Sequence, residues 1–188
     1  MRGGRQGTAI LLIAAAIVFL LIFKYIRRPT VPRANSGMAI SKHASEVRIG
    51  PPAIYPNPKR TPGSVNPAVR QANIHETVCN PSWRTRFIRP SNSYTTRLKA
   101  LQIVQWGLSG NAADYEEDHL ISLELGGHPS DPHNLWPEPY EPKPGAREKD
   151  VVERFLHKQV CDDLVTLEEA QKAIATDWYK IYLELHVQ

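Results

Sequence analysis

The sequence contains little cysteine and only one long apolar run. Two of its 188 residues are cysteine, which is too few for a disulfide-rich miniprotein or for a zinc site of four thiolates, although it suffices for one disulfide. A single apolar run excludes a multi-span membrane protein. Hydrophobic residues make up 41% and charged residues 22%, so the chain is not fully disordered. At this length we expect one domain or little more.

Acidic residues are nearly absent from the first 74 residues. That segment holds 11 Lys and Arg against one acid, Glu46, whereas residues 75–188 hold 12 Lys and Arg against 18 Asp and Glu. The net charge of +4 therefore combines a segment at +10 with a segment at −6. Because the basic character belongs to the N-terminal part, it is no indication that the C-terminal part binds nucleic acid.

The apolar run occupies residues 9–23 and has the sequence AILLIAAAIVFLLIF. This length is marginal for a hydrocarbon core of about 30 Å, but Tyr25 and Ile26 extend it, and the Lys and Arg that follow can snorkel. Residues 1–28 are therefore predicted to form a transmembrane segment that acts as a signal anchor. A cleaved signal peptide and a buried soluble helix are the alternatives, although no small-x-small cleavage site follows the run directly.

Residues 29–74 are predicted to be a Pro-rich linker. Eight prolines fall within residues 27–74, and no apolar periodicity is sustained there. Such a segment lacks the apolar residues for a core and is expected to be extended. The folded domain is then residues 75–188.

The domain contains signals for three helices and a strand. Ser93 is placed to cap a helix that ends at Gly107. Thr166 and Glu169 have the spacing of a capping box before a last helix, which runs through about residue 182. The other expected elements are an extended stretch at 78–88, a strand at 117–125, a turn at 126–127, a Pro-rich loop at 129–145 and a helix at 146–160.

The most informative segment is residues 116–139, with the sequence EEDHLISLELGGHPSDPHNLWPEP. An Asp-His pair begins an apolar strand, a Gly-Gly turn follows, and Asn134 lies in a returning segment before the next helix. The pattern resembles the HNH endonuclease family, over about residues 116–158. The resemblance implies an α+β fold with a ββα-metal core, in which a small antiparallel hairpin packs on a helix that closes a metal site, with further helices on either side.

The resemblance also assigns roles to the residues of the motif. His119 is a general base, Asp118 is a metal ligand, and Asn134 orients the His119 ring. A neutral imidazole can take a proton from water near neutral pH, and a divalent ion can polarise a phosphoryl oxygen. The ion is Mg2+, Mn2+, Zn2+ or Ni2+. Because neighbouring side chains on a strand point to opposite faces, Asp118 and His119 need a bend to serve one site.

The helix expected at 146–160 departs from the family pattern, which places a histidine near its start. Asp150, Glu153 and His157 fall within a 60° arc of one helix face, and any two of them have the spacing to share a metal ion. We expect one of the three to complete the metal site. The alternative is a solvated helix face that pairs with Arg154 and Lys158.

A basic stretch precedes the motif. Arg84, Arg86 and Arg89 lie in a segment without acidic residues, with Trp83 before them and Phe87 between them. In an otherwise acidic domain, these arginines are the candidates for contact with the phosphates of nucleic acid. A solvated basic surface is the alternative.

Cys79 and Cys161 lie on either side of the motif and are expected to form a disulfide, with two reduced buried thiols as the alternative. A disulfide would place the domain in an oxidising compartment. We therefore expect a membrane-anchored domain outside the cytoplasm, or a secreted one after signal cleavage. A structural zinc domain is disfavoured because the two cysteines lack CxxC spacing.

Two functions follow from the sequence. The first is a metal-dependent endonuclease that hydrolyses DNA, with RNA as a second substrate, and has little sequence specificity. The second is a non-catalytic module on the same fold, tethered to the membrane, which binds nucleic acid or is structural. The incomplete histidine pattern of the helix at 146–160 keeps the second function open.

Overall fold

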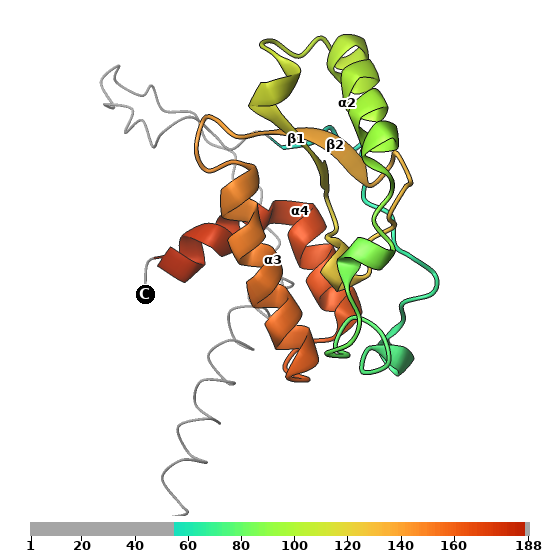
Figure 1. The fold of residues 1–188 in the computed structure, drawn as a ribbon. Coiled ribbons are helices and arrows are strands. Elements are labelled where there is room, and N and C mark those ends of the chain that lie inside the picture. The colour runs from blue at the N-terminus through green and yellow to red at the C-terminus, as the bar shows by residue number, and fades with distance from the viewer. Residues whose placement is uncertain (1–54, 187–188) are drawn as a thin grey trace, which may run out of the picture. The chain divides into compact units, whose positions relative to one another are not determined.

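The computed structural model describes residues 55–186, which belong to one compact unit (Figure 1). The predicted signal anchor and the first part of the predicted linker, residues 29–54, lie outside the described residues. Within residues 55–186, no helix has the length and apolar composition needed to cross a membrane.

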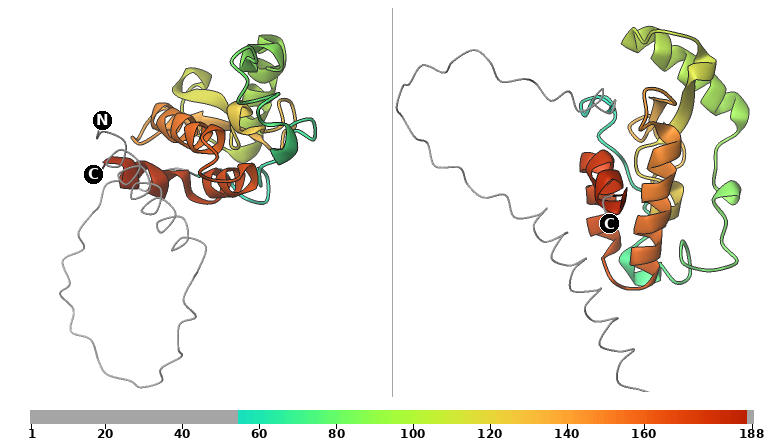
Figure 2. Two further views of the ribbon diagram at one scale, coloured as in Figure 1. Left: turned by 90° about the horizontal axis from the view of Figure 1, so that it is seen from below. Right: turned by 90° about the vertical axis from the view of Figure 1, so that its left-hand side faces the viewer.

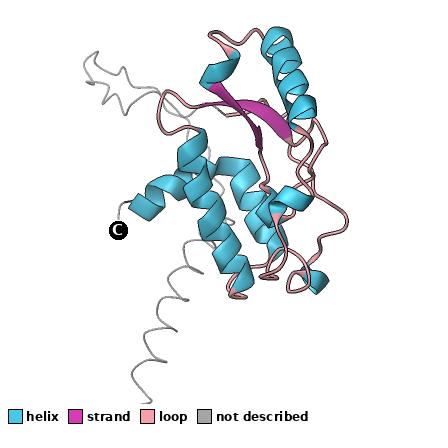
Figure 3. Cartoon of the chain, viewed as in Figure 1, coloured by secondary structure: helices cyan, strands magenta, loops and turns pink. Residues whose placement is uncertain are grey.

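The centre of the unit is a two-stranded antiparallel sheet. Strand β1, Tyr115–His119, pairs with β2, Leu135–Pro139, in a register that places Asp118 opposite Trp136 (Figure 3). The expected α+β class and the hairpin are thus confirmed. The strand expected at 117–125 is shorter, since β1 ends at His119 and a short 3-10 helix, η4, Leu123–Leu125, follows.

The early end of β1 has a side-chain cause. The Asn134 side chain accepts a hydrogen bond from the Ile121 N–H and donates one to the Ile121 carbonyl, both at 2.9 Å. These two backbone groups are therefore satisfied by an amide side chain and not by a partner strand. Residues 129–145 were expected to form one Pro-rich loop. The strand β2 lies inside this range, so the loop is divided into two shorter segments, one before β2 and one after it.

Helix α2, Asn92–Trp106, packs against the hairpin. Its N-cap is Ser91, whose Oγ accepts a hydrogen bond from the Tyr94 N–H, so the predicted cap at Ser93 is wrong by two residues. The helix ends as expected at Gly107, which has a φ of 66°. Its buried residue is Gln102, whose amide donates to the Leu135 carbonyl at 2.9 Å.

The segment before α2 is not extended. Residues 78–88 form turns and a 3-10 helix, η2, Thr85–Phe87. The Asn80 side chain accepts from the Ser82 N–H at 2.8 Å, which closes an Asx turn ahead of η2. The prediction of an extended stretch overlooked this turn chemistry.

Two long helices complete the unit. Helix α3, Ala146–Cys161, contacts β1, and α4, Leu167–His186, packs along α3 (Figures 1 and 2). The capping box before α4 is confirmed, because the Thr166 N–H donates to the Glu169 carboxylate and the Glu169 N–H donates to Thr166 Oγ1. A kink at Asp177 divides α4.

The predicted boundary at residue 75 is wrong, because residues 55–74 belong to the folded unit. Thr61 and Ile74 are each 1% exposed, and Val69 is 7% exposed. The Gly63 N–H donates to the His133 carbonyl at 2.9 Å, and Val65 forms a β-bridge with Gly127. This segment therefore covers the turn that connects β1 and β2, and it does so with a few isolated apolar residues that show no periodicity.

Candidate functional site

A pocket of about 220 Å³ lies where the end of β1 meets α3. Four of the predicted site residues line it: Asp118, His119, Asp150 and Glu153. Asp118 and His119 are neighbours on β1 and both line the pocket, and the chain bends at the two residues directly after β1 ends at His119. The remaining lining residues are Thr85, Arg89, Ser122, Leu123, Glu124 and Arg154.

His119 is 3% exposed and its ring is held in one orientation. Its Nε2 lies 2.9 Å from the Pro129 carbonyl oxygen. Because a carbonyl only accepts hydrogen bonds, Nε2 carries the proton and Nδ1 keeps a free lone pair. Burial lowers the pKa of His119, so the imidazole is neutral at pH 7. The ring therefore has the charge and tautomer of a proton acceptor.

Asn134 is fully buried, but it does not bond to the His119 ring as expected. Its amide bonds to the Ile121 backbone and donates to the His128 carbonyl at 3.1 Å. The next carbonyl along the chain, that of Pro129, is the partner of His119. Asn134 thus holds the loop at His128 and Pro129 in place, and this loop in turn holds the His119 ring through the Pro129 carbonyl. Gly127 is needed there, because a Cβ at this position would lie 1.8 Å from the Ile121 oxygen.

Lys149 lies between the carboxylates of β1 and α3 and is 0% exposed. Its Nζ donates to Asp118 Oδ2 at 2.6 Å, to the His119 carbonyl at 2.9 Å and to Glu153 Oε1. Burial opposes the charged form of Lys149, but the surrounding carboxylates outweigh it and raise its pKa well above the usual value. Burial on its own would raise the pKa of Asp118. The Lys149 charge and the hydrogen bonds to Asp118 outweigh burial, so the pKa of Asp118 is below its usual value.

Glu138 joins this cluster from β2 and is also 0% exposed. Neither of its carboxyl oxygens has a hydrogen-bond donor among the described residues. Burial raises the pKa of Glu138 well above its usual value, and the nearby Asp118 carboxyl group raises it further, while Lys149 lowers it. Lys149 and Glu138 were both missed by the sequence reasoning. The strand register places Glu138 opposite Glu116. Glu116 and Asp118 are two residues apart on β1 and share a face of the sheet, so Glu138 lies on that face too.

The α3 residues with predicted ligand roles separate into two groups. Asp150 and Glu153 line the pocket, where burial raises the pKa of Asp150 and brings that of Glu153 to about 8. His157 points elsewhere, with Nε2 at 2.9 Å from the Val78 carbonyl and 3.4 Å from Cys161 Sγ. His157 is therefore not part of the Asp118–His119 pocket.

The three predicted substrate-binding arginines separate as well. Arg89 lines the pocket with Arg154 of α3, which the sequence reasoning did not select. Arg84 donates to the Pro81 and Trp83 carbonyls. The Arg86 guanidinium lies over the Phe87 ring, 4.9 Å from its centre. Only Arg89 of the three is therefore placed beside the catalytic candidates.

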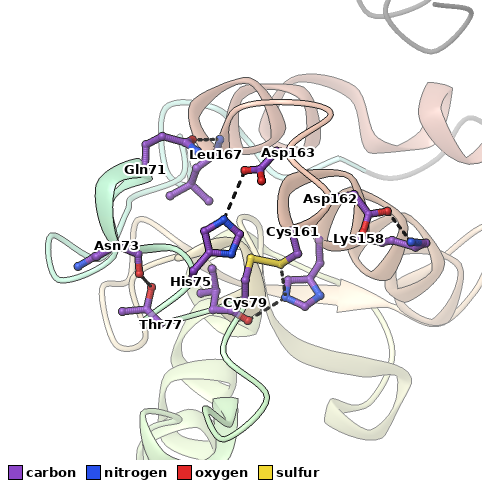
Figure 4. The surroundings of a disulfide bond; sticks show 12 residues. Gln71, Asn73, His75, Thr77, Cys79, Lys158, Cys161, Asp162, Asp163 and Leu167 are labelled. Carbon is purple, nitrogen blue, oxygen red and sulfur yellow. Dashed lines mark hydrogen bonds and ion pairs between the residues drawn. A yellow bond between two sulfur atoms is a disulfide. The ribbon is translucent and has the colours of Figure 1, made fainter. Parts of the chain in front are cut away.

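The predicted disulfide between Cys79 and Cys161 is confirmed, and it joins the loop before η2 to the end of α3 (Figure 4). With His157, the cysteines form a group whose candidate metal-binding atoms all lie within 4.8 Å. The bond leaves no thiolate, however. His157 Nε2 faces a carbonyl and so carries a proton. In this oxidised state the group therefore lacks the two thiolates that a Cys-His-Cys metal site would use.

Glu117 precedes Asp118 on β1 and lies near Lys99 of α2. Its buried carboxyl group should make the free energy of unfolding depend on pH. Burial raises its pKa to about 8, although Lys99 opposes this. The folded state then holds a proton that the unfolded state releases above about pH 4.3, so this contribution to stability is lost as the pH rises toward 8. We expect the free energy of unfolding of Glu117→Gln, relative to the wild type, to rise by about 1–2 kcal/mol between pH 5 and 8.5.

Urea unfolding of the full-length chain at both pH values measures this difference. Glu76→Gln is the matched control, because Glu76 is exposed and should show no change with pH relative to the wild type. An equal pH dependence of the wild type and Glu117→Gln would contradict the prediction.

Comparison with known proteins identifies no relative. No protein-family model matches the chain, and neither a curated protein nor a solved structure shows a significant match. The assignment of a function therefore depends on the geometry of the pocket.

Proposed function

We propose that this protein is a metal-dependent endonuclease with an HNH-type ββα-metal core, which hydrolyses the phosphodiester bonds of DNA and, as a second substrate, RNA. One observation carries the proposal. A neutral imidazole, that of His119, lines a single pocket with two arginines and four acidic residues, Asp118, Glu124, Asp150 and Glu153. This is the combination that phosphodiester hydrolysis needs: a base, ligands for a cation, and positive charge for the phosphate.

The residues of the pocket fit a divalent cation. Carboxylate oxygens are the ligands that Mg2+ and Mn2+ prefer. Lys149 bonds to one oxygen of Asp118 and one of Glu153, so the second oxygen of each is not used by Lys149. Ser122 Oγ and Glu124 Oε1, both in the pocket lining, are buried without a hydrogen-bond partner among the described residues. Asp118, Glu153 and Asp150 would hold the ion.

The chain's own groups then divide the reaction between them. His119 Nδ1 takes a proton from the attacking water, while the Pro129 carbonyl keeps the ring in place. Arg89 and Arg154 bind the non-bridging oxygens of the phosphate. A divalent ion held by Asp118, Glu153 and Asp150 would supply further positive charge to stabilise the transition state. Contacts of this kind read the backbone and not the bases, so little sequence specificity is expected.

The proposal includes a location outside the cytoplasm. The Cys79–Cys161 disulfide is typical of proteins in oxidising compartments, and the apolar run at 9–23 supports an N-terminal membrane anchor or a cleaved signal. An unspecific nuclease held there is kept away from the chromosome of its own cell.

A second candidate function is a non-catalytic nucleic-acid-binding module. The observation that favours it is the Lys149 ammonium, which already forms ion pairs with two of the carboxylates that would hold the metal ion. In that case the arginines bind phosphate but no hydrolysis follows.

Plasmid nicking by the full-length chain, purified in detergent, separates the two functions. We expect conversion of supercoiled to open-circular DNA with Mg2+, Mn2+, Zn2+ or Ni2+, and no conversion once a chelator removes the ion. A gel-shift assay in the chelator should still detect binding, weaker at higher salt. If the chain binds DNA but nicks it with none of the four ions, the proposed endonuclease is overturned and the binding module is supported.

A further inference from the structure

Lys149 is a fixed cation inside the acidic cluster, as its hydrogen bonds show. Its Nζ has three acceptors: Asp118 Oδ2, the His119 carbonyl and Glu153 Oε1. An ammonium has three N–H groups and a neutral amine has two, so all three bonds require the charged form. The residue is 0% exposed, so its ammonium group is covered by protein and depends on these acceptors.

One ammonium does not balance the carboxyl groups that surround it. Asp118 and Glu153 bond to it directly, and Glu124 and Asp150 line the adjoining pocket. Glu138 adds an independent observation, since its buried carboxyl group is directed at Asp118 and has no donor among residues 55–186. The cluster therefore has capacity for more positive charge than Lys149 provides.

We propose that Lys149 is a resident cation that takes the place of a second divalent ion, so that the pocket accepts one ion and not two. In two-metal hydrolytic sites, carboxylates bridge two ions that lie about 3.5–4 Å apart. Here Lys149 provides that bridge between β1 and α3, and it holds the Asp118 and Glu153 carboxylates at a fixed separation. The inference rests on the proposed function, since it concerns the metal site of that same pocket.

The inference predicts that removing this charge strengthens metal binding. A buried ammonium close to a divalent ion repels it, and a neutral side chain of similar length does not. We expect Lys149→Met to bind Mn2+ at least about tenfold more tightly than the wild type, and to take up a second ion. A residue with a merely structural role would not change the affinity or stoichiometry in this direction.

Calorimetric titration of the full-length chain with Mn2+ tests this, with Lys158→Met as the matched control. Lys158 lies on the same helix and pairs with Asp162, but it is exposed and outside the pocket. Its variant should bind Mn2+ as the wild type does. Lys149→Gln is the second neutral variant, since its amide keeps N–H donors for Asp118 and Glu153. Folding of either Lys149 variant only in the presence of Mn2+ would itself support the inference.

The outcomes separate the inference from the proposed function. If the wild type binds Mn2+ and the neutral variants bind it equally or more weakly, the inference is overturned and the proposed function stands. Should the wild type bind no Mn2+ while Lys149→Met does, the wild-type pocket accepts no ion, and both the single-ion inference and the metal-dependent activity are overturned. If none of the chains binds Mn2+, both are overturned.

Discussion

Replacing His119 with alanine should lower the rate of plasmid nicking by about 10²–10⁴-fold, the usual contribution of a general base. The reason is that His119 lines the pocket and Nδ1 is the unprotonated nitrogen of its ring, since Nε2 donates to the Pro129 carbonyl. Nicking rates at saturating metal, measured on the full-length chain, give the ratio. The loss should appear in the rate of strand cleavage and not in DNA affinity, since the arginines remain.

The matched control is His133→Ala. His133 lies in the same connection between β1 and β2, but its side chain is 63% exposed and pairs with Asp131. Its variant should cleave DNA within about twofold of the wild type, as expected for an exposed side chain outside the site. His119→Gln serves where the alanine variant is unstable, because glutamine can still donate to the Pro129 carbonyl but has no basic nitrogen. Unchanged nicking by both His119 variants would refute its role as the base.

Removal of the Cys79–Cys161 disulfide should have the largest effect on stability. The bond spans 82 positions of the chain, and closure of such a loop corresponds to about 4.5 kcal/mol of free energy in the chain-entropy model. The double variant Cys79→Ala/Cys161→Ala should therefore unfold at a melting temperature lower by on the order of 10 °C. Thermal unfolding followed by circular dichroism is the measurement.

Dithiothreitol provides the internal control for this prediction. It should lower the melting temperature of the wild type by a similar amount and leave that of the double variant unchanged. If the reduced wild type melts within about 2 °C of the oxidised chain, a stability change too small for the loss of this crosslink, the prediction is contradicted.

The sequence was informative wherever the signal is local. The capping box of Thr166 and Glu169, the helix stop at Gly107 and the helix at 146–160 are all read from neighbouring residues, and the structure has each of them. The misplaced cap at Ser93 and the overlooked turn at Asn80 are errors of the same local kind, since several serines and asparagines there can each accept a backbone hydrogen bond.

The extent of the folded unit could not be read from the sequence. Residues 55–74 contain many prolines and no apolar period, which is typical of a linker, yet Thr61 and Ile74 are buried. A segment that lies along the surface of an existing core needs no period of its own, because only occasional side chains point inward. Periodicity detects regular elements and misses irregular ones.

What the sequence alone determined is the set of groups at the heart of the candidate site: Asp118 and His119 as neighbours, Asn134 in the returning segment, and acids on one face of the following helix. Tertiary structure alone decided that Asp150 and Glu153 line the pocket while His157 lies beside the disulfide. It also brought Lys149 and Glu138 to Asp118. Helical spacing defines which residues share a face, but the rotation of that helix against the hairpin, and the register of the two strands, are set by packing between distant segments.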